Sequence, residues 1–251
     1  AALDHVAGAN ANTTMAVGSL YVVDGATLTA DRTYTLPAVA AVGDRIGVMM
    51  SAGSASYEVL LTAASGDTLN GVAGGTEWSR LFITGEVVIM RCVAASATWI
   101  VEYDGRIAQL GEMSLTADCD GEAANTTTLP TSAGTPGTWT VNAQIGIAAT
   151  AATGRLTVRR GGKYSATVGM RTKDAPGASA LLTAVIQKNG ATVRSGTNTC
   201  TASLTGGAMT ETAASASADD YFQMAYSTSS GGLGCRGAAA LTFLIVSEVL
   251  P

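Results

Sequence analysis

The chain has 251 residues with a formal net charge of −5; 47% of them are apolar, 13% charged and 5% aromatic. A mean hydropathy of +0.28 excludes intrinsic disorder, which requires low hydrophobicity and high net charge. The single histidine, His5, excludes a histidine-rich metal site. Three lysines and an acidic balance disfavour nucleic-acid binding, because phosphate contacts need clustered cations.

The first segment, residues 1–14, is small and polar, and we expect it to act as a short anchoring arm with His5 on its surface. It lacks the basic start and apolar core of a signal peptide. The best candidate, the stretch 241–246 with Thr242 as its one polar residue, is far shorter than the roughly 20 residues of a membrane span. We therefore expect no membrane insertion.

Short strands are predicted throughout the first hundred residues, because valine and threonine suit a pleated surface and turn signals recur between them. Asn70-Gly71 is one such turn. The predicted strands cover 20–23, 33–36, 45–50, 57–62, 81–84, 86–93 and 98–103. We place a domain boundary in 104–112, which gives an N-terminal β domain over 1–107.

An ordered set of motifs in residues 30–104 resembles a small β domain of tailed-phage fibre, spike and other virion proteins. In that family a "TLP…GD.I.V" hairpin precedes a "GDTING"-like turn and an "A.W.V" closing strand. The matching segments here are 34–37, 42–46, 66–71 and 97–101. The resemblance implies that this chain belongs to a virion.

The second half predicts alternating strands over 155–159 and 163–171, joined as a hairpin at Gly161-Gly162, and another hairpin at Asn189-Gly190. Further strands are predicted over 199–205, 221–227 and 238–249. The last contains the continuous apolar run 241–246, which predicts burial on both faces and therefore a subunit interface on one of them. The fold class is thus all-β, with two β-sandwich or jelly-roll modules in tandem, 1–107 and 108–251.

Several motifs of the second half resemble the trimeric jelly roll of the tumour-necrosis-factor and complement type. The matching segments are 162–168, 186–190, 218–224 and the terminal strand 241–246. Asp219-Asp220 stands where that family has Gly-Asp, and the aromatic residues that line the family's trimer axis are sparse. The resemblance implies a homotrimer whose axis lies near the C-terminal strand.

Partner contacts are assigned to the basic cluster Arg155, Arg159 and Arg160 and to Trp78. On an alternating strand Arg155 and Arg159 share a face, where guanidinium groups can hold carboxylates of a neighbouring protein. A solvated outer sheet face is the simpler interpretation of the same pattern. Trp78 follows Gly74-Gly75 in a predicted loop, whereas Trp99 is expected in the core.

Two acidic clusters are candidate metal sites. Asp219-Asp220 offers two carboxylates, and Asp118, Asp120 and Glu122 resemble half of an EF-hand loop without its flanking helices. An acidic turn and a solvated loop are the preferred interpretations, so no metal or cofactor is predicted. The four cysteines lack a Cys-x-x-Cys pair and are expected to be reduced, mostly buried thiols, with Cys200–Cys235 the pairing to test.

These features predict a structural protein rather than an enzyme. We expect a homotrimeric capsid decoration protein that is made in the host cytoplasm and docks through the major capsid protein on the outer surface of a phage particle. The alternative is a tail fibre or receptor-binding protein that attaches to a host surface glycan or protein. The absence of a long repetitive stalk favours decoration.

Overall fold

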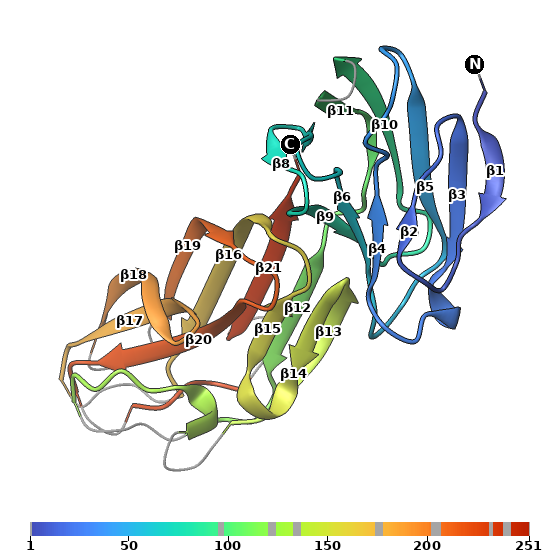
Figure 1. Ribbon diagram of the computed structural model, residues 1–251. Coiled ribbons are helices and arrows are strands. Elements are labelled where there is room, and N and C mark those ends of the chain that lie inside the picture. The colour runs from blue at the N-terminus through green and yellow to red at the C-terminus, as the bar shows by residue number, and fades with distance from the viewer. Residues whose placement is uncertain are drawn as a thin grey trace. The chain divides into compact units, whose positions relative to one another are not determined.

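The computed structural model describes residues 2–94, 98–119, 124–132, 137–173, 178–201, 207–230, 233–237 and 242–250. The chain is all-β and forms two compact units, Ala1–Ile107 and Ala108–Pro251 (Figure 1). Its helices are single 3₁₀ turns, η1 (Gly25–Thr27), η2 (Pro130–Ser132) and η3 (Ala151–Thr153). In the described part of the chain, no helix has the length and apolar character needed to cross a membrane.

The first unit consists of two sheets that enclose one core. The seven-stranded sheet has the order β1-β3-β5-β10-β11-β7-β8 and the four-stranded sheet the order β2-β4-β6-β9. The strands are β1 (Asp4–Ala7), β2 (Thr13–Thr14), β3 (Ser19–Asp24), β4 (Arg32–Thr35), β5 (Arg45–Ala52), β6 (Val59–Thr62), β7 (Thr68–Leu69), β8 (Val72–Ala73), β9 (Glu77–Leu81), β10 (Val87–Ala94) and β11 (Thr98–Gly105).

The chain alternates between these sheets through its first six strands. β1, β3 and β5 pair in parallel in one sheet, while β2, β4 and β6 pair in parallel in the other. The predicted hairpin over 34–46 is therefore wrong, because β4 and β5 belong to different sheets. The fully buried Tyr34 and Ile46 enter the same core from these two strands, so the strands face each other across it instead of pairing.

The N-terminal segment is paired within this unit, and its anchoring role stays a prediction. Residues 4–7 form β1 and pair with 19–22 of β3, and His5 lies exposed opposite Leu20. Two other predictions for this unit are confirmed. Trp99 is fully buried in the core, and Asn70 and Gly71 take the φ values of 48° and 79° that a tight β7–β8 turn requires.

The second unit is a sandwich of two antiparallel five-stranded sheets, with the orders β13-β12-β21-β16-β19 and β14-β15-β20-β17-β18. Its strands are β12 (Leu110–Leu115), β13 (Trp139–Ile145), β14 (Ile147–Thr150), β15 (Arg155–Val158), β16 (Gly162–Arg171), β17 (Ala180–Lys188), β18 (Ala191–Cys200), β19 (Gly207–Ala216), β20 (Tyr221–Thr228) and β21 (Phe243–Val249). Side chains from both sheets form one core. We call the sheet that contains β21 the β21 sheet and the other the β15 sheet.

The predicted hairpin at Gly161-Gly162 is wrong. β15 pairs with β14 and β20, whereas β16 pairs with β19 and β21, so the glycines carry the chain from one sheet to the other. Leu156 and Tyr164 are both fully buried in the common core, which they enter from opposite sheets. The Asn189-Gly190 turn is confirmed: it joins β17 to β18 with φ values of 51° and 79°.

Two further predicted strands agree with β20 and β21. The predicted strand over 199–205 overlaps the end of β18 at Cys200, and 202–206 lie outside the described residues. The sequence analysis does not predict β12, β13, β14 and β19. β14 and β19 are rich in alanine and threonine, and small side chains leave little contrast between the two faces of a strand.

Candidate functional site

The outer face of the β21 sheet is the candidate interaction surface. Along β21, Leu244 and Val246 are fully buried, whereas Phe243 and Ile245 lie partly exposed on the opposite face. The predicted strand is thus apolar on both sides, and one side remains open in the single chain. Leu241, with which the apolar run begins, lies outside the described residues.

Register between the strands brings a second apolar side chain beside Phe243. Gly169 of β16 pairs with Phe243 on one side and with Met209 of β19 on the other. A Cβ at Gly169 would lie 2.5 Å from the Phe243 ring, so the ring lies across the glycine. Met209 is 69% exposed. A hollow of about 450 Å³ opens here, lined by residues of β16, β18, β19 and β21.

This face has a mixed but weakly charged character. On β16 this face carries the half-buried Ser165 and Thr167, whereas the apolar side chains of that strand lie in the core. Exposed charges on the same strands are Lys163 and Arg171 at the ends of β16, and Glu211 on β19. Such a surface suits contact with another protein, because covering apolar area contributes about 25 cal/mol per Å², while the charges set the register of the contact.

Of the predicted partner residues, Arg155 begins β15 and Arg159 directly follows that strand. Arg155 lies with its guanidinium carbon 4.1 Å from the centre of the Tyr221 ring and donates through Nε to Gln223 Oε1 at 3.1 Å. Arg159 is half-buried, and its backbone N–H donates to Gln109 Oε1 at 2.9 Å. The structure therefore does not bring these two residues to the β21 sheet face.

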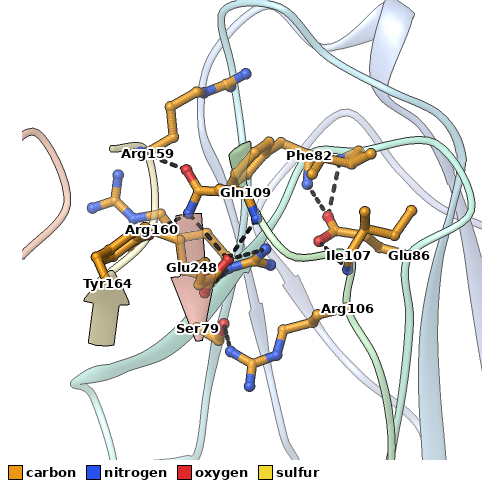
Figure 2. Close-up of polar contacts among 12 residues, drawn as sticks. Ser79, Phe82, Glu86, Arg106, Ile107, Gln109, Arg159, Arg160, Tyr164 and Glu248 are labelled. Carbon is orange, nitrogen blue, oxygen red and sulfur yellow. Dashed lines mark hydrogen bonds and ion pairs between the residues drawn. The ribbon is translucent and has the colours of Figure 1, made fainter. Parts of the chain in front are cut away.

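Arg160 does not lie on a surface, so its assignment to a partner contact is wrong. Its side chain is fully buried and pairs with Glu248 of β21, with Nε–Oε1 and Nη2–Oε2 distances of 3.1 Å (Figure 2). The chain turns inward at this position, where it leaves β15 and crosses to β16. Glu248 itself carried a signal, because it continues the buried series Leu244, Val246 as a charged residue.

A buried polar network surrounds this ion pair. The backbone N–H of Gln109 donates to Glu248 Oε2 at 3.1 Å, and the Gln109 amide donates to the Tyr164 hydroxyl at 2.5 Å. Tyr164 in turn donates to the Arg160 carbonyl at 2.6 Å. The network links the beginning of the second unit to its last strand, so we interpret it as structural.

Trp78 lies on β9 rather than in the predicted loop, and it is half-buried against the first unit's core. The guanidinium carbon of Arg106 lies 4.7 Å from its ring centre. Arg106 is itself held by Asp104 at 2.6 Å, and it donates to the Ser79 hydroxyl at 2.8 Å (Figure 2). One face of the indole is therefore already covered by this chain, which leaves less of it for an external sugar or protein.

The acidic turn at Asp219-Asp220 is used internally. Asp220 accepts hydrogen bonds from the Asn189 amide at 2.6 Å and the Ser217 N–H at 2.8 Å, and it lies 3.3 Å from the Lys188 ammonium. Burial opposes ionisation of this carboxyl, but the hydrogen bonds from Asn189 and Ser217 and the Lys188 charge outweigh it and lower the pKa of Asp220. Asp219 is exposed with a φ of 69°.

The second acidic cluster is only partly described. Asp118 accepts the Gly237 N–H at 2.6 Å, whereas Asp120 and Glu122 lie outside the described residues. Where side chains are described, no group of three or more histidine, cysteine or acidic residues could hold a metal ion.

All four cysteines are buried, and none of them forms a disulfide. The pairing singled out from the sequence, Cys200–Cys235, is wrong, since the residue beside Cys235 is Cys119. The Cys235 N–H donates to Cys119 Sγ at 3.2 Å, and the Cys119 N–H donates to the Cys235 carbonyl at 3.1 Å. No local motif could have indicated this pair, because 116 positions separate its members.

Comparison with known proteins gives limited similarities. No protein-family model matches the chain, and no curated protein sequence matches it. Among solved structures, murine APRIL is similar over 57% of this chain and all of its own, with 10% identity and a TM-score of 0.42. Eiger TNF from S. frugiperda is similar over 58% of this chain and 94% of its own, with 12% identity and a TM-score of 0.44. At these identities and scores, neither similarity enters the argument for fold or function.

Proposed function

We propose that the protein is a homotrimeric structural component of a tailed-phage virion, which decorates the outer surface of the capsid through contacts with the major capsid protein. The observation that carries the self-association is the open apolar face of the β21 sheet. Phe243, Ile245 and Met209 lie on this face, and Met209 is 69% exposed. Fully burying side chains of this size contributes about 1.5–3 kcal/mol each.

The number of subunits and the virion setting rest on the sequence motifs. Residues 162–168, 186–190, 218–224 and 241–246 resemble a trimeric jelly roll, and residues 30–104 resemble a virion β domain. In the trimer we propose, the β21 sheets of three copies approach one axis, and Phe243 and Ile245 become buried there.

Charge supports an outward position on the particle. The net charge of −5 gives the protein the same sign as packaged DNA, and like charges repel. A position on the outer surface of the capsid separates the protein from the packaged DNA. The remaining surfaces of the trimer then face the capsid or neighbouring trimers.

Light scattering of the purified chain tests the self-association. The expected mass is three times that of the 25.1 kDa chain. Ile245→Glu should reduce the assembly to monomer, because a carboxylate would be buried without a partner. Leu181→Glu is the matched control, since Leu181 is 51% exposed on the other sheet. A monomeric wild-type chain at micromolar concentration, or equal behaviour of both variants, would overturn the assignment of this face.

Copy number in purified virions tests the decoration role. Hundreds of copies per particle are expected for a capsid decoration protein, whereas a handful would indicate the tail fibre role. A glycan-binding screen of the assembled protein further distinguishes the decoration role from the tail fibre role. Reproducible binding to a glycan of the host surface would favour receptor attachment over decoration.

A further inference from the structure

Two thiols from distant parts of the second unit lie against each other in its interior. Cys119 follows β12, and Cys235 precedes β21. Both residues are fully buried, and their backbones and side chains exchange the hydrogen bonds described above.

The segments that carry these thiols are held in place from both sides. Gly237 packs so closely that a Cβ there would lie 2.2 Å from the Ala117 carbonyl carbon, and its N–H is bonded to Asp118. On the opposite side, the Arg236 N–H donates to the Arg171 carbonyl at 2.8 Å and the Lys173 N–H to the Gly234 carbonyl at 2.9 Å. These contacts hold the two segments, and with them Cys119 and Cys235, next to each other.

The two thiols are chemically unequal. The hydrogen bond from Cys235 is the largest influence on Cys119 and lowers its pKa to about 7, although burial acts in the opposite direction. Burial is the main influence on Cys235 and raises its pKa well above the ordinary thiol value. The Cys119 sulfur also lies 3.7 Å from the Tyr226 hydroxyl. Cys119 is therefore the more acidic thiol of the pair.

We propose that Cys119 is a peroxide-reactive cysteine and that Cys235 is its resolving partner, so that the pair forms a disulfide under oxidising conditions. The Cys119 thiolate attacks one oxygen of hydrogen peroxide, the O–O bond breaks, and the leaving hydroxide takes up a proton to become water. The Cys235 sulfur then attacks the resulting sulfenic acid. The S–O bond breaks, and a second water leaves with the Cys235 proton. Two thiols lose two electrons, and one peroxide becomes two waters.

The disulfide would link the segment after β12 to the segment before β21, and these two strands pair with each other. It would close a loop of 116 residues, and long loops gain most from closure because the unfolded chain loses more freedom. The unit would therefore be reducible during synthesis and more resistant to unfolding after oxidation. This inference does not depend on the proposed function.

Peroxide treatment of the full-length wild-type chain tests the proposal. Mass spectrometry after non-reducing digestion should show a Cys119–Cys235 linked peptide that disappears on reduction. The rate of its formation should rise with pH around the Cys119 pKa of about 7. The melting temperature should rise by about 10 °C. A failure to form this bridge at peroxide concentrations that oxidise a free thiol, or a bridge to another cysteine, would overturn the proposal.

Serine variants assign the roles. Cys235→Ser should leave a sulfenic acid on Cys119 that a dimedone probe labels, whereas Cys119→Ser should abolish both labelling and bridging. Cys200→Ser is the matched control, because Cys200 is also buried but lies outside the pair. In this variant the Cys119–Cys235 bridge should form as in the wild type. Should a variant fail to fold, the wild-type peptide map and its pH dependence still decide the question.

Discussion

Arg160 and Glu248 form an ion pair that is almost completely removed from solvent, with side-chain exposures of 0% and 2%. Removing a charge from water is costly, and the attraction between the partners returns that cost only when the geometry is good and the remaining polar atoms are bonded. Both conditions hold here, because each Glu248 oxygen accepts a hydrogen bond from an Arg160 nitrogen at 3.1 Å, and the Gln109 N–H donates to the same carboxylate.

Breaking this pair should therefore strongly destabilise the second unit. Arg160→Leu leaves a buried carboxylate without its cation, and we expect it to lower the free energy of unfolding by about 3–5 kcal/mol. Urea denaturation measures this change. Arg45→Leu is the control: the Arg45–Glu102 pair is 35% exposed on both sides, and its loss should cost less than about 1 kcal/mol. Adding Glu248→Leu to Arg160→Leu should recover part of the stability. Equal losses in the two single variants would contradict this account.

Gly74 and Gly75 are adjacent glycines that are needed for different reasons. A Cβ at Gly74 would lie 1.6 Å from the Ala64 carbonyl oxygen, whereas Gly75 has open space but a φ of 79°. Gly75→Ala should cost about 1–2 kcal/mol through backbone strain, and Gly75→Asn should cost less because asparagine tolerates this region better. Gly74→Ala and Gly74→Asn should each lower the stability more than either Gly75 variant does, because the backbone of a neighbouring segment must move. Thermal unfolding of the four variants checks this order.

The lowered pKa of Asp220 predicts a pH-dependent contribution to stability. A carboxyl whose folded pKa lies below its unfolded value stabilises the protein above the unfolded pKa, and the stabilisation is lost as pH falls through the folded value. The Asp220→Asn variant should therefore be less stable than the wild type at pH 7. The difference should shrink below the ordinary aspartate value of 3.8. Chemical denaturation at several pH values measures it, and a constant difference would show that the carboxylate charge has no role.

Self-association through the β21 sheet predicts that stability depends on concentration. A partner that binds only the folded chain shifts the unfolding equilibrium by mass action. The wild-type melting temperature should thus rise as concentration increases from the micromolar range, whereas that of Ile245→Glu should stay constant. Leu181→Glu should behave as the wild type. A concentration-independent wild-type transition would argue that the apolar face remains open in solution.

The all-β class and the tight turns could be predicted because both depend on local sequence. Asn70-Gly71 and Asn189-Gly190 adopt the left-handed conformations that these residue types favour. Alternation also indicated which side of a strand is buried, as at Leu156 and Val158. These signals extend over a few residues and need no knowledge of the rest of the chain.

Strand partners could not be predicted in the same way. Two neighbouring strands with a glycine turn between them can pair, or they can face each other across a core, and the alternation is the same in both arrangements. This ambiguity misled the interpretation at β4–β5 and at β15–β16. It also placed Arg160 on a surface, since its carboxylate partner lies 88 positions later in the chain.

The position of β12 has a consequence for the order of folding during synthesis. β12 is the first strand of the second unit, and it lies between β13 and β21, which is the last strand. Gly111 pairs with Val246, so the middle of this sheet remains incomplete until the ribosome has released the end of β21. The first unit has all its strands by Gly105 and meets no such delay. A nascent chain that has not yet reached β21 will therefore carry one finished domain and one open sheet, and products truncated before Phe243 will have a second domain that cannot close.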